Sequence, residues 1–143
     1  MIAVLDTNIL LAALLNPLGA PAKIRQRWRQ QQFDLLISDA TLEEYTDVLL
    51  HSPTISVGEV TELLTELKAF SQHIQINGTL QACKDSDDDI FLETAVVGGA
   101  DFLVTKNLKH FPHKSYGGVR IVKVSTFLKA VEKTFPVQLF ASS

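Results

Sequence analysis

The sequence predicts an α/β fold with a mainly parallel central sheet. Short runs of β-branched and other apolar residues alternate with longer segments in which apolar residues recur at helical spacing. Strands that alternate with helices in this way pair in parallel, because each helix returns the chain to the same end of the sheet. The opening run IAVL is apolar throughout, as expected of a central parallel strand that is buried on both faces.

The expected elements follow one another along the chain. Strands are expected at residues 2–5, 33–37, 73–76, 102–105 and 119–124, and helices at residues 9–15, 21–31, 40–50, 57–70, 88–97 and 125–132. Pro21 suits a first helical turn, and Ser56 with Glu59 forms a capping box before the fourth helix. Gly98-Gly99 ends the fifth helix.

Length and hydrophobic content favour one domain. The chain has 143 residues, of which 46% are hydrophobic, so residues 1–143 are expected to fold around a single core. No run approaches the roughly 18 apolar residues of a membrane span, and the opening run lacks the basic leader of a signal peptide. The tail at residues 135–143 is either a last strand or a loose apolar end.

Charge and cysteine usage restrict the function classes. The single cysteine, Cys83, has no intrachain disulfide partner, which fits the reducing cytoplasm. The formal net charge of −3 argues against a protein that binds nucleic acid by bulk electrostatics alone. A divalent cation at an acidic site would reverse the local field and recruit phosphate.

An acidic residue directly follows the first strand. Asp6 opens the run Asp6-Thr7-Asn8, at the carboxyl end of a strand, where open α/β sheets bind their ligands. The simpler interpretation is that Asp6 or Asn8 only caps the helix that follows.

A second carboxylate lies on the helix after the second strand. Glu44 borders the apolar face of that helix, whereas Glu43 and Asp47 point farther into solvent. Glu44 is therefore expected to face the edge of the sheet. The alternative is an ordinary solvated helix carboxylate.

The run Asp85-Ser86-Asp87-Asp88-Asp89 is the strongest local signal. Like charges this close repel one another, so the run is either a solvated loop or a cation site. Asp88 shares a helical stripe with apolar residues and is expected to look toward the sheet, while Asp89 is rotated away. A simpler role for these acids is to complement the dipole of the helix.

The fourth strand brings polar residues to the same edge. Thr105 and Asn107 follow it, and a neutral Asn can ligate a metal or orient water. Lys106 and Lys109, with His110, suggest phosphate contacts or plain surface. Carboxylates after three separate elements, without a Cys or His cluster, favour Mg2+ or Mn2+ and metal-assisted hydrolysis of phosphate esters.

Four segments resemble the PIN-domain family, and within it the VapC-like ribonucleases that are toxin components of bacterial toxin–antitoxin systems. They are VLDTNILLAALL, LLISDATLEEYTDVL, DSDDDIFLETAVVGGADFLVT and NLKHFP. The resemblance implies a three-layer α/β/α sandwich around a parallel sheet, an Mg2+- or Mn2+-dependent endoribonuclease activity and an RNA substrate. It also implies an antitoxin protein as partner and a homodimer, for which Trp28 and its neighbouring arginines offer a contact.

The same resemblance assigns the site residues. The family acids that bind the metal fall on Asp6, Glu44 and Asp88, with Asp89 as the alternative to Asp88 if the match shifts by one residue. Asp85, Asn8 and Thr7 fall in supporting places, and Thr105 falls on the small hydroxyl residue of the family.

Asn107 departs from the family pattern, because many relatives carry a fourth Asp there. The loss of that charge is expected to weaken binding of a second metal. It also motivates a second function, a catalytically weakened PIN domain that acts as an RNA-binding or protein-docking module. A third function, a phosphohydrolase with Asp6 as nucleophile, would need a second Asp at the position of Asn8.

Overall fold

Six strands form one sheet in the computed structural model of the chain, which describes residues 1–136. The strands are β1 (Ile2–Leu5), β2 (Asp34–Ile37), β3 (Gln72–His73), β4 (Phe102–Val104), β5 (Ser115–Tyr116) and β6 (Val119–Val122), in the spatial order β3-β2-β1-β4-β6-β5. Every pair is parallel except β5 with β6. The expected mainly parallel sheet is confirmed.

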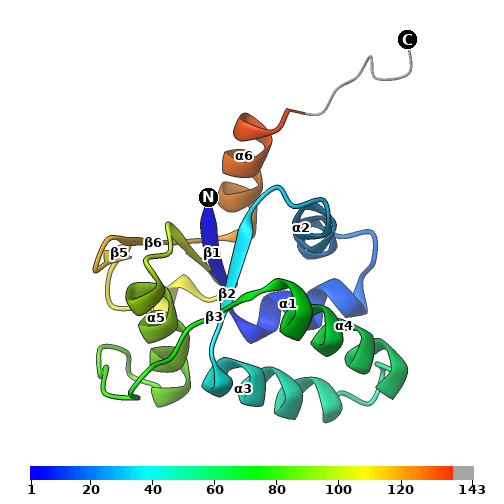
Figure 1. The fold of residues 1–143 in the computed structure, drawn as a ribbon, viewed down its shortest axis with the longest axis horizontal. Coiled ribbons are helices and arrows are strands. Elements are labelled where there is room, and N and C mark those ends of the chain that lie inside the picture. Colours follow the sequence, from blue (N-terminus) through cyan, green and yellow to red (C-terminus); the bar gives the residue numbers. More distant parts are fainter. Residues whose placement is uncertain (137–143) are drawn as a thin grey trace.

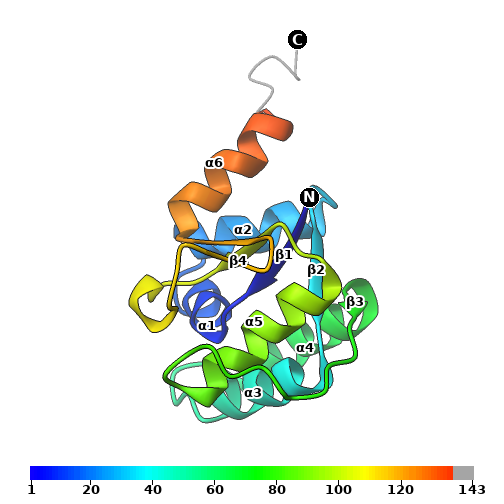
Figure 2. The ribbon, with the colours of Figure 1, turned by 90° about the vertical axis from the view of Figure 1, so that its left-hand side faces the viewer.

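Helices cover both faces of the sheet. They are α1 (Thr7–Leu15), α2 (Ala20–Arg29), α3 (Asp39–Leu50), α4 (Val57–Phe70), α5 (Ser86–Gly98) and α6 (Val124–Thr134), with a short 3-10 helix η1 (Leu108–His110). Figure 1 shows α5 on one side of β1 and β2, with α1, α2 and α4 on the other, and α3 lies below the strands. The view in Figure 2 places α6 next to α2. The three-layer α/β/α arrangement is therefore confirmed.

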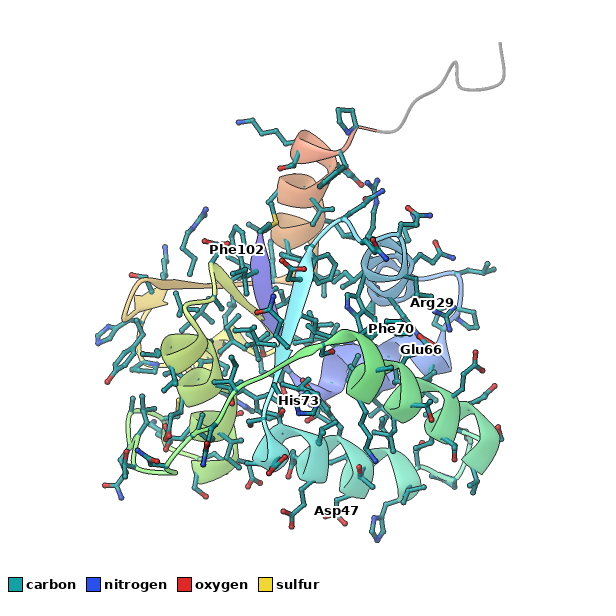
Figure 3. The ribbon with its side chains drawn as sticks, in the orientation of Figure 1. Arg29, Asp47, Glu66, Phe70, His73 and Phe102 are labelled. Atoms are coloured by element: carbon teal, nitrogen blue, oxygen red, sulfur yellow. The ribbon has the colours of Figure 1, made fainter. Side chains whose placement is uncertain are left out.

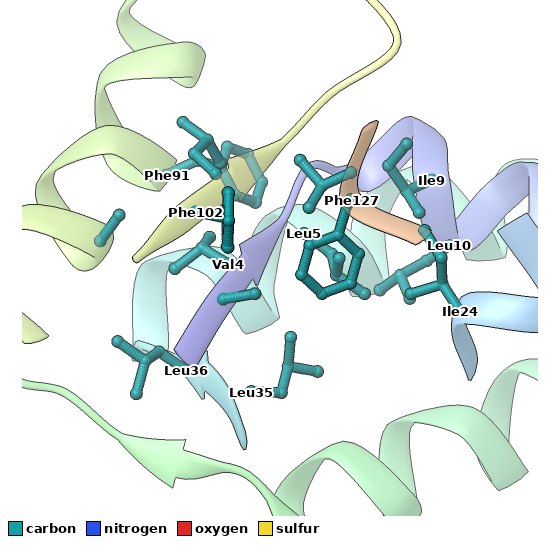
Figure 4. Packing of buried hydrophobic residues seen from close by; sticks show 14 of the residues in the cluster. Val4, Leu5, Ile9, Leu10, Ile24, Leu35, Leu36, Phe91, Phe102 and Phe127 are labelled. Atoms are coloured by element: carbon teal, nitrogen blue, oxygen red, sulfur yellow. The ribbon is translucent and has the colours of Figure 1, made fainter. Parts of the chain in front are cut away.

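The core fills both interfaces between the sheet and the helices. Figure 4 shows Phe91 of α5 on one side of β1, and Ile9 and Ile24 from α1 and α2 on the other. Each of these side chains is at most 2% exposed. Because β1 is buried on both faces, its uninterrupted apolar sequence is accounted for.

Local sequence signals fix several helix ends. The Ser38 hydroxyl accepts the backbone N–H of Thr41 at the start of α3, and the Ser56 hydroxyl accepts that of Glu59 at the start of α4. Gly99 ends α5 in the left-handed conformation, with φ of 68°, which glycine adopts without steric cost. Pro21 lies in the first turn of α2, as predicted.

The prediction of a strand at residues 73–76 is wrong in extent. The pairing of β3 with β2 covers Gln72 and His73 and ends with the bond from the Ile74 N–H to the Ile37 carbonyl, 2.7 Å long. Beyond this point the N–H groups of Asn77 and Gly78 bind the side chain of Glu93, so they are not available to a neighbouring strand.

Two short elements were not predicted. The strand β5 pairs with β6 through a hairpin at Gly117 and Gly118, whose φ values of 55° and 85° suit a tight two-residue turn. The short helix η1 follows β4. The expectation for the tail falls mostly on residues 137–143, which lie outside the described part of the chain.

Trp28 does not offer a surface for a partner. The side chain is 6% exposed and belongs to the core, which corrects its prediction as a dimer contact. Two of the neighbouring arginines, Arg25 and Arg29, bind the Glu66 carboxylate at 2.8 and 2.5 Å. Among residues 1–136, none of the helices combines the length and apolar character needed to cross a bilayer.

Tyr45 ties α3 to the central strand. Its ring is fully buried, and its hydroxyl donates a hydrogen bond of 2.5 Å to the carbonyl of Leu5. This carbonyl is the last of β1, so the bond fixes the end of the strand from which the next residue, Asp6, projects.

Tyr45→Phe tests this contact. Because the substitution leaves the buried Leu5 carbonyl without its donor, we expect the free energy of unfolding to fall by about 1–2 kcal/mol. Chemical denaturation measures the change. The other tyrosine, the half-buried Tyr116, is the control, since its hydroxyl makes no hydrogen bond within residues 1–136. An equal loss in Tyr116→Phe would contradict a specific role for the Tyr45 bond.

Candidate active site

The carboxyl ends of β1 and β4 bring Asp6 and Thr105 together. Leu5 is paired with Val104, and the N–H of Asp6 donates to the Val104 carbonyl at 2.9 Å. The next residue of the second strand, Thr105, is fully buried and donates from Oγ1 to Asp6 Oδ2 at 2.8 Å. The parallel register thus orients a carboxylate that is itself only 6% exposed.

The simpler interpretation of Asp6 as a helix cap is not supported. Asp6 occupies the position before the first residue of α1, but its side chain makes no capping hydrogen bond. Thr7 is buried, and its hydroxyl has no hydrogen-bond partner. Asn8 is exposed. The carboxylate of Asp6 is therefore available to a ligand on the side away from Thr105.

Asp88, in the first turn of α5, projects a second carboxylate into the same region. The residue is 8% exposed, and Oδ2 is buried without a hydrogen-bond partner. Nδ1 of His110 lies 3.3 Å from this oxygen, close enough for an ion pair when the imidazole is protonated, but without the geometry of a hydrogen bond. A buried carboxylate oxygen without a donor is costly unless a cation compensates it.

Burial is the main cause that raises the pKa of Asp88 to about 6; His110 opposes this rise, and the charges of Asp6, Asp85 and Asp87 contribute to it. The carboxylates of Asp6 and Asp88, from two different elements, are therefore close enough to interact electrostatically. Negative charge is concentrated there beyond what the surrounding groups neutralise.

Glu44 lies half-buried on α3 at the border of its apolar face, as predicted. Burial raises the pKa of its carboxyl, and the charges of Asp87, Asp47, Asp85 and Asp6 act in the same direction. Glu44 is therefore within electrostatic range of the acids at the start of α5 and after β1.

The remaining acids of α5 have structural roles. Asp85 caps the helix, since its side chain accepts the N–H of Asp87. Asp89 accepts the N–H groups of Ala82 and Cys83 at 2.9 and 2.8 Å. Because one oxygen of Asp89 is occupied by the loop, whereas Asp88 Oδ2 has no hydrogen-bond partner, the geometry favours Asp88 over Asp89 as a ligand.

Glu93, one helical turn beyond Asp89, was not singled out from the sequence. It is 5% exposed, and its two oxygens accept the N–H groups of Asn77, Gly78 and Leu80. Burial opposes the charged form, but these backbone donors outweigh it and lower the pKa of Glu93. Together with Asp89 it holds the loop that leads to the acids at the start of α5.

The segment after β4 completes the edge of the region. Asn107 is half-buried and donates its backbone N–H to Thr105 Oγ1 at 3.0 Å, which joins it to Asp6 through one hydroxyl. Lys106 and Lys109 are exposed, as surface cations that contact phosphate would be. The contact of His110 with Asp88 was not predicted, because sequence spacing does not relate the two segments.

The donor set fits a hard divalent cation. Asp6, Glu44 and Asp88 offer carboxylate oxygens, and Asp88 Oδ2 is buried without a partner. Within residues 1–136, no three His, Cys, Asp or Glu side chains lie close enough together to hold an ion as they stand. Since carboxylates without a counter-ion repel one another, binding would require these side chains to draw together.

Cavities elsewhere in the molecule are separate from these acids. One of about 520 Å3 is lined by Trp28, Arg29, Glu66, Phe70 and residues at the start of β2. Figure 3 shows Arg29, Glu66 and Phe70 between α2 and α4. A second, of about 830 Å3, is lined by the start of α3 and the loop after β3. Asp6, Glu44 and Asp88 line neither of these two cavities.

Comparisons with known proteins agree with the fold. A family model described as PIN domain matches residues 3–109. The uncharacterized protein MJ1680 of Methanocaldococcus jannaschii is 30% identical over 97 residues, which cover 64% of this chain but only 62% of that relative. The crystal structure of VapBC2 from Rickettsia felis, bound to a DNA fragment from their promoter, is also similar. That match has a TM-score of 0.57 and 18% identity, and it covers 86% of this chain and 98% of the other.

Glu93→Gln tests the attachment of the loop. Since the pKa of Glu93 is lowered, its contribution to stability is present above the unfolded-state value of about 4.3 and is lost as pH falls below it. We expect a loss of about 1–3 kcal/mol in unfolding free energy at pH 7, and a smaller difference from wild type below pH 4. Denaturation at several pH values measures it. The exposed Glu43→Gln is the control.

Asp88→Asn is expected to stabilise the metal-free protein. Because the pKa of Asp88 is raised to about 6, the charged carboxylate destabilises the fold increasingly between pH 4 and 6 and fully above that range. In EDTA at pH 7.5 the variant should gain on the order of 1 kcal/mol, and the gain should vanish near pH 4. A loss of stability at pH 7.5 would show that the carboxylate is instead well compensated.

Proposed function

The chain belongs to the PIN-domain family, and we propose that it is an endoribonuclease that hydrolyses RNA phosphodiester bonds with Mg2+ or Mn2+. One observation above all supports the proposal: the buried Oδ2 of Asp88 has no hydrogen-bond partner and lies in the same acidic region as Asp6. A buried carboxylate oxygen without a hydrogen-bond donor destabilises a fold, so hydrophobic packing does not account for it. A bound cation would compensate the charge of this oxygen.

Asp6, Glu44 and Asp88 are the proposed ligands. They come from three elements that meet at the carboxyl end of the sheet, and their oxygen donors suit Mg2+ and Mn2+. When bound, such a cation neutralises phosphate charge and lowers the pKa of water, which is the chemistry that phosphodiester hydrolysis needs.

The surrounding residues prepare these ligands. Thr105 donates to Asp6 Oδ2, which holds one oxygen in place and leaves the other for a ligand. Asp85 is a supporting residue, because its side chain caps the helix that carries Asp88. The exposed Lys106 and Lys109 are placed after β4 to contact the phosphates of a bound strand.

We extend the proposal to the biological role. The similar crystal structure is that of VapBC2 from Rickettsia felis, and the family resemblance in the sequence points to the same class. The chain is proposed to be a toxin component that acts in the cytoplasm as a homodimer, with an antitoxin protein that covers the acidic edge. The reason for an antitoxin is that uninhibited ribonuclease activity would harm the host cell.

Asp6→Asn tests the activity. The substitution keeps the size of the side chain and its acceptor for Thr105, but removes the charge that binds the cation. We expect Mn2+-dependent cleavage of a fluorescent RNA to fall by roughly a hundredfold, since each tenfold corresponds to about 1.4 kcal/mol. Circular dichroism should remain unchanged.

The control for this test is Asp47→Asn on α3, which makes the same charge change at an exposed position (Figure 3). Cleavage that persists at the wild-type rate in Asp6→Asn would refute the proposal. Tight RNA binding without cleavage by the wild-type chain, at any Mn2+ concentration, would favour the alternative that Asn107 motivates, a catalytically weakened RNA-binding module.

A further inference from the structure

The segment after β4 brings no carboxylate to the acidic region. From Thr105 to Lys114 the sequence reads TKNLKHFPHK, which contains no acidic residue. The proposed ligands are Asp6 after β1, Glu44 on α3 and Asp88 on α5. Two groups from this segment contact acids of the site: the Thr105 hydroxyl binds Asp6, and Nδ1 of the His110 imidazole lies 3.3 Å from Asp88 Oδ2.

We propose that His110 is a nitrogen ligand of the divalent cation, next to Asp88. This inference rests on the proposed function, because it assigns a further ligand to the same metal. Adjacent ligands of an octahedral ion, each about 2.1 Å from it, are separated by about 3 Å. The two atoms are thus spaced as neighbouring donors to one ion would be.

Burial and exposure of the pair agree with this role. Asp88 Oδ2 is buried and has no hydrogen-bond partner, so one of its lone pairs is available. The imidazole side chain is 52% exposed, so no desolvated pocket fixes it and a ligand can reach it from solvent. A neutral imidazole has one unprotonated ring nitrogen, whose lone pair can bind a metal ion.

The backbone around His110 is fixed with respect to Asp6. His110 donates its N–H to the Asn107 carbonyl at 3.1 Å, and Asn107 in turn donates to Thr105 Oγ1, which binds Asp6. Phe111, the next residue, is 6% exposed and anchors the end of η1 in the core. The imidazole is therefore carried by a segment that is held from both ends.

A nitrogen donor changes the metal preference of the site. Mg2+ strongly favours oxygen ligands, whereas Mn2+ binds imidazole more readily. With His110 as a ligand, the site should select Mn2+ over Mg2+ more strongly than three carboxylates alone. Removing the imidazole should weaken Mn2+ binding and change Mg2+ binding little.

Pulsed electron paramagnetic resonance of the Mn2+-loaded chain tests the assignment directly. A coordinated imidazole gives 14N modulation of the Mn2+ signal, so we expect modulation in the wild type and its loss in His110→Ala. His113→Ala is the matched control, since His113 is exposed three residues farther along the same segment. It should retain the modulation.

Calorimetric titration with Mn2+ and Mg2+ gives a second readout. In His110→Ala we expect the Kd for Mn2+ to rise by roughly tenfold or more and the Kd for Mg2+ to rise less than about threefold. Tighter binding of both ions would overturn the inference, because it would show that the imidazole competes with the metal as a counter-ion of Asp88. Unchanged 14N modulation in the variant would overturn it as well.

Asp6→Asn separates the failure of this inference from that of the proposed function. If Asp6→Asn abolishes Mn2+ binding while His110→Ala changes neither the modulation nor the affinities, only the assignment of His110 fails. If Asp6→Asn binds Mn2+ as the wild type does, the carboxylate site itself is wrong, and the assignment of His110 fails with it.

Discussion

The proposed cation site depends on buried negative charge, at the carboxyl end of the sheet, that neighbouring groups do not fully compensate. The parallel pairing of β1 with β4 places Asp6 beside Thr105, and α5 directs Asp88 to the same region. Burial and mutual repulsion raise the pKa of Asp88 to about 6, so the metal-free fold carries a cost that a cation would relieve. Asp6 is held by its bond to Thr105 and Asp88 by the first turn of α5, so both charges remain buried in the metal-free protein.

The acids of α5 have two different roles: Asp89 and Glu93 stabilise the fold, and Asp88 is the proposed ligand. Asp89 and Glu93 lie on one stripe of the helix, and both accept backbone N–H groups of the loop at residues 77–83. Their charges are compensated by several donors each, so they stabilise the fold. Asp88 is adjacent to Asp89 but is turned by about 100° around the helix, and it has no backbone donor on Oδ2. Neighbouring residues of one type therefore have opposite effects on stability.

Several sequence-based predictions were limited by contacts between distant segments. The strand predicted at residues 73–76 pairs with β2 only at Gln72 and His73, because β2 itself ends at Ile37, and the chain beyond it is held by Glu93 at Asn77 and Gly78. Trp28 was assigned to a surface because arginines surround it in sequence, yet the helix turns it into the core. The contact of His110 with Asp88 joins segments 22 residues apart in the chain, and no periodicity predicts it.

The sequence by itself determined the α/β class and the order of the main strands and helices along the chain, apart from the short β5 and η1. These follow from local physics, because apolar periodicity and capping residues act over a few positions. Tertiary structure alone decided that Asp89 binds the preceding loop while Asp88 Oδ2 has no donor, that Thr105 rather than a helix end holds the Asp6 carboxylate, and that an imidazole lies against Asp88. The physical reason is that burial and charge interactions depend on distances in space, which the order of residues does not contain.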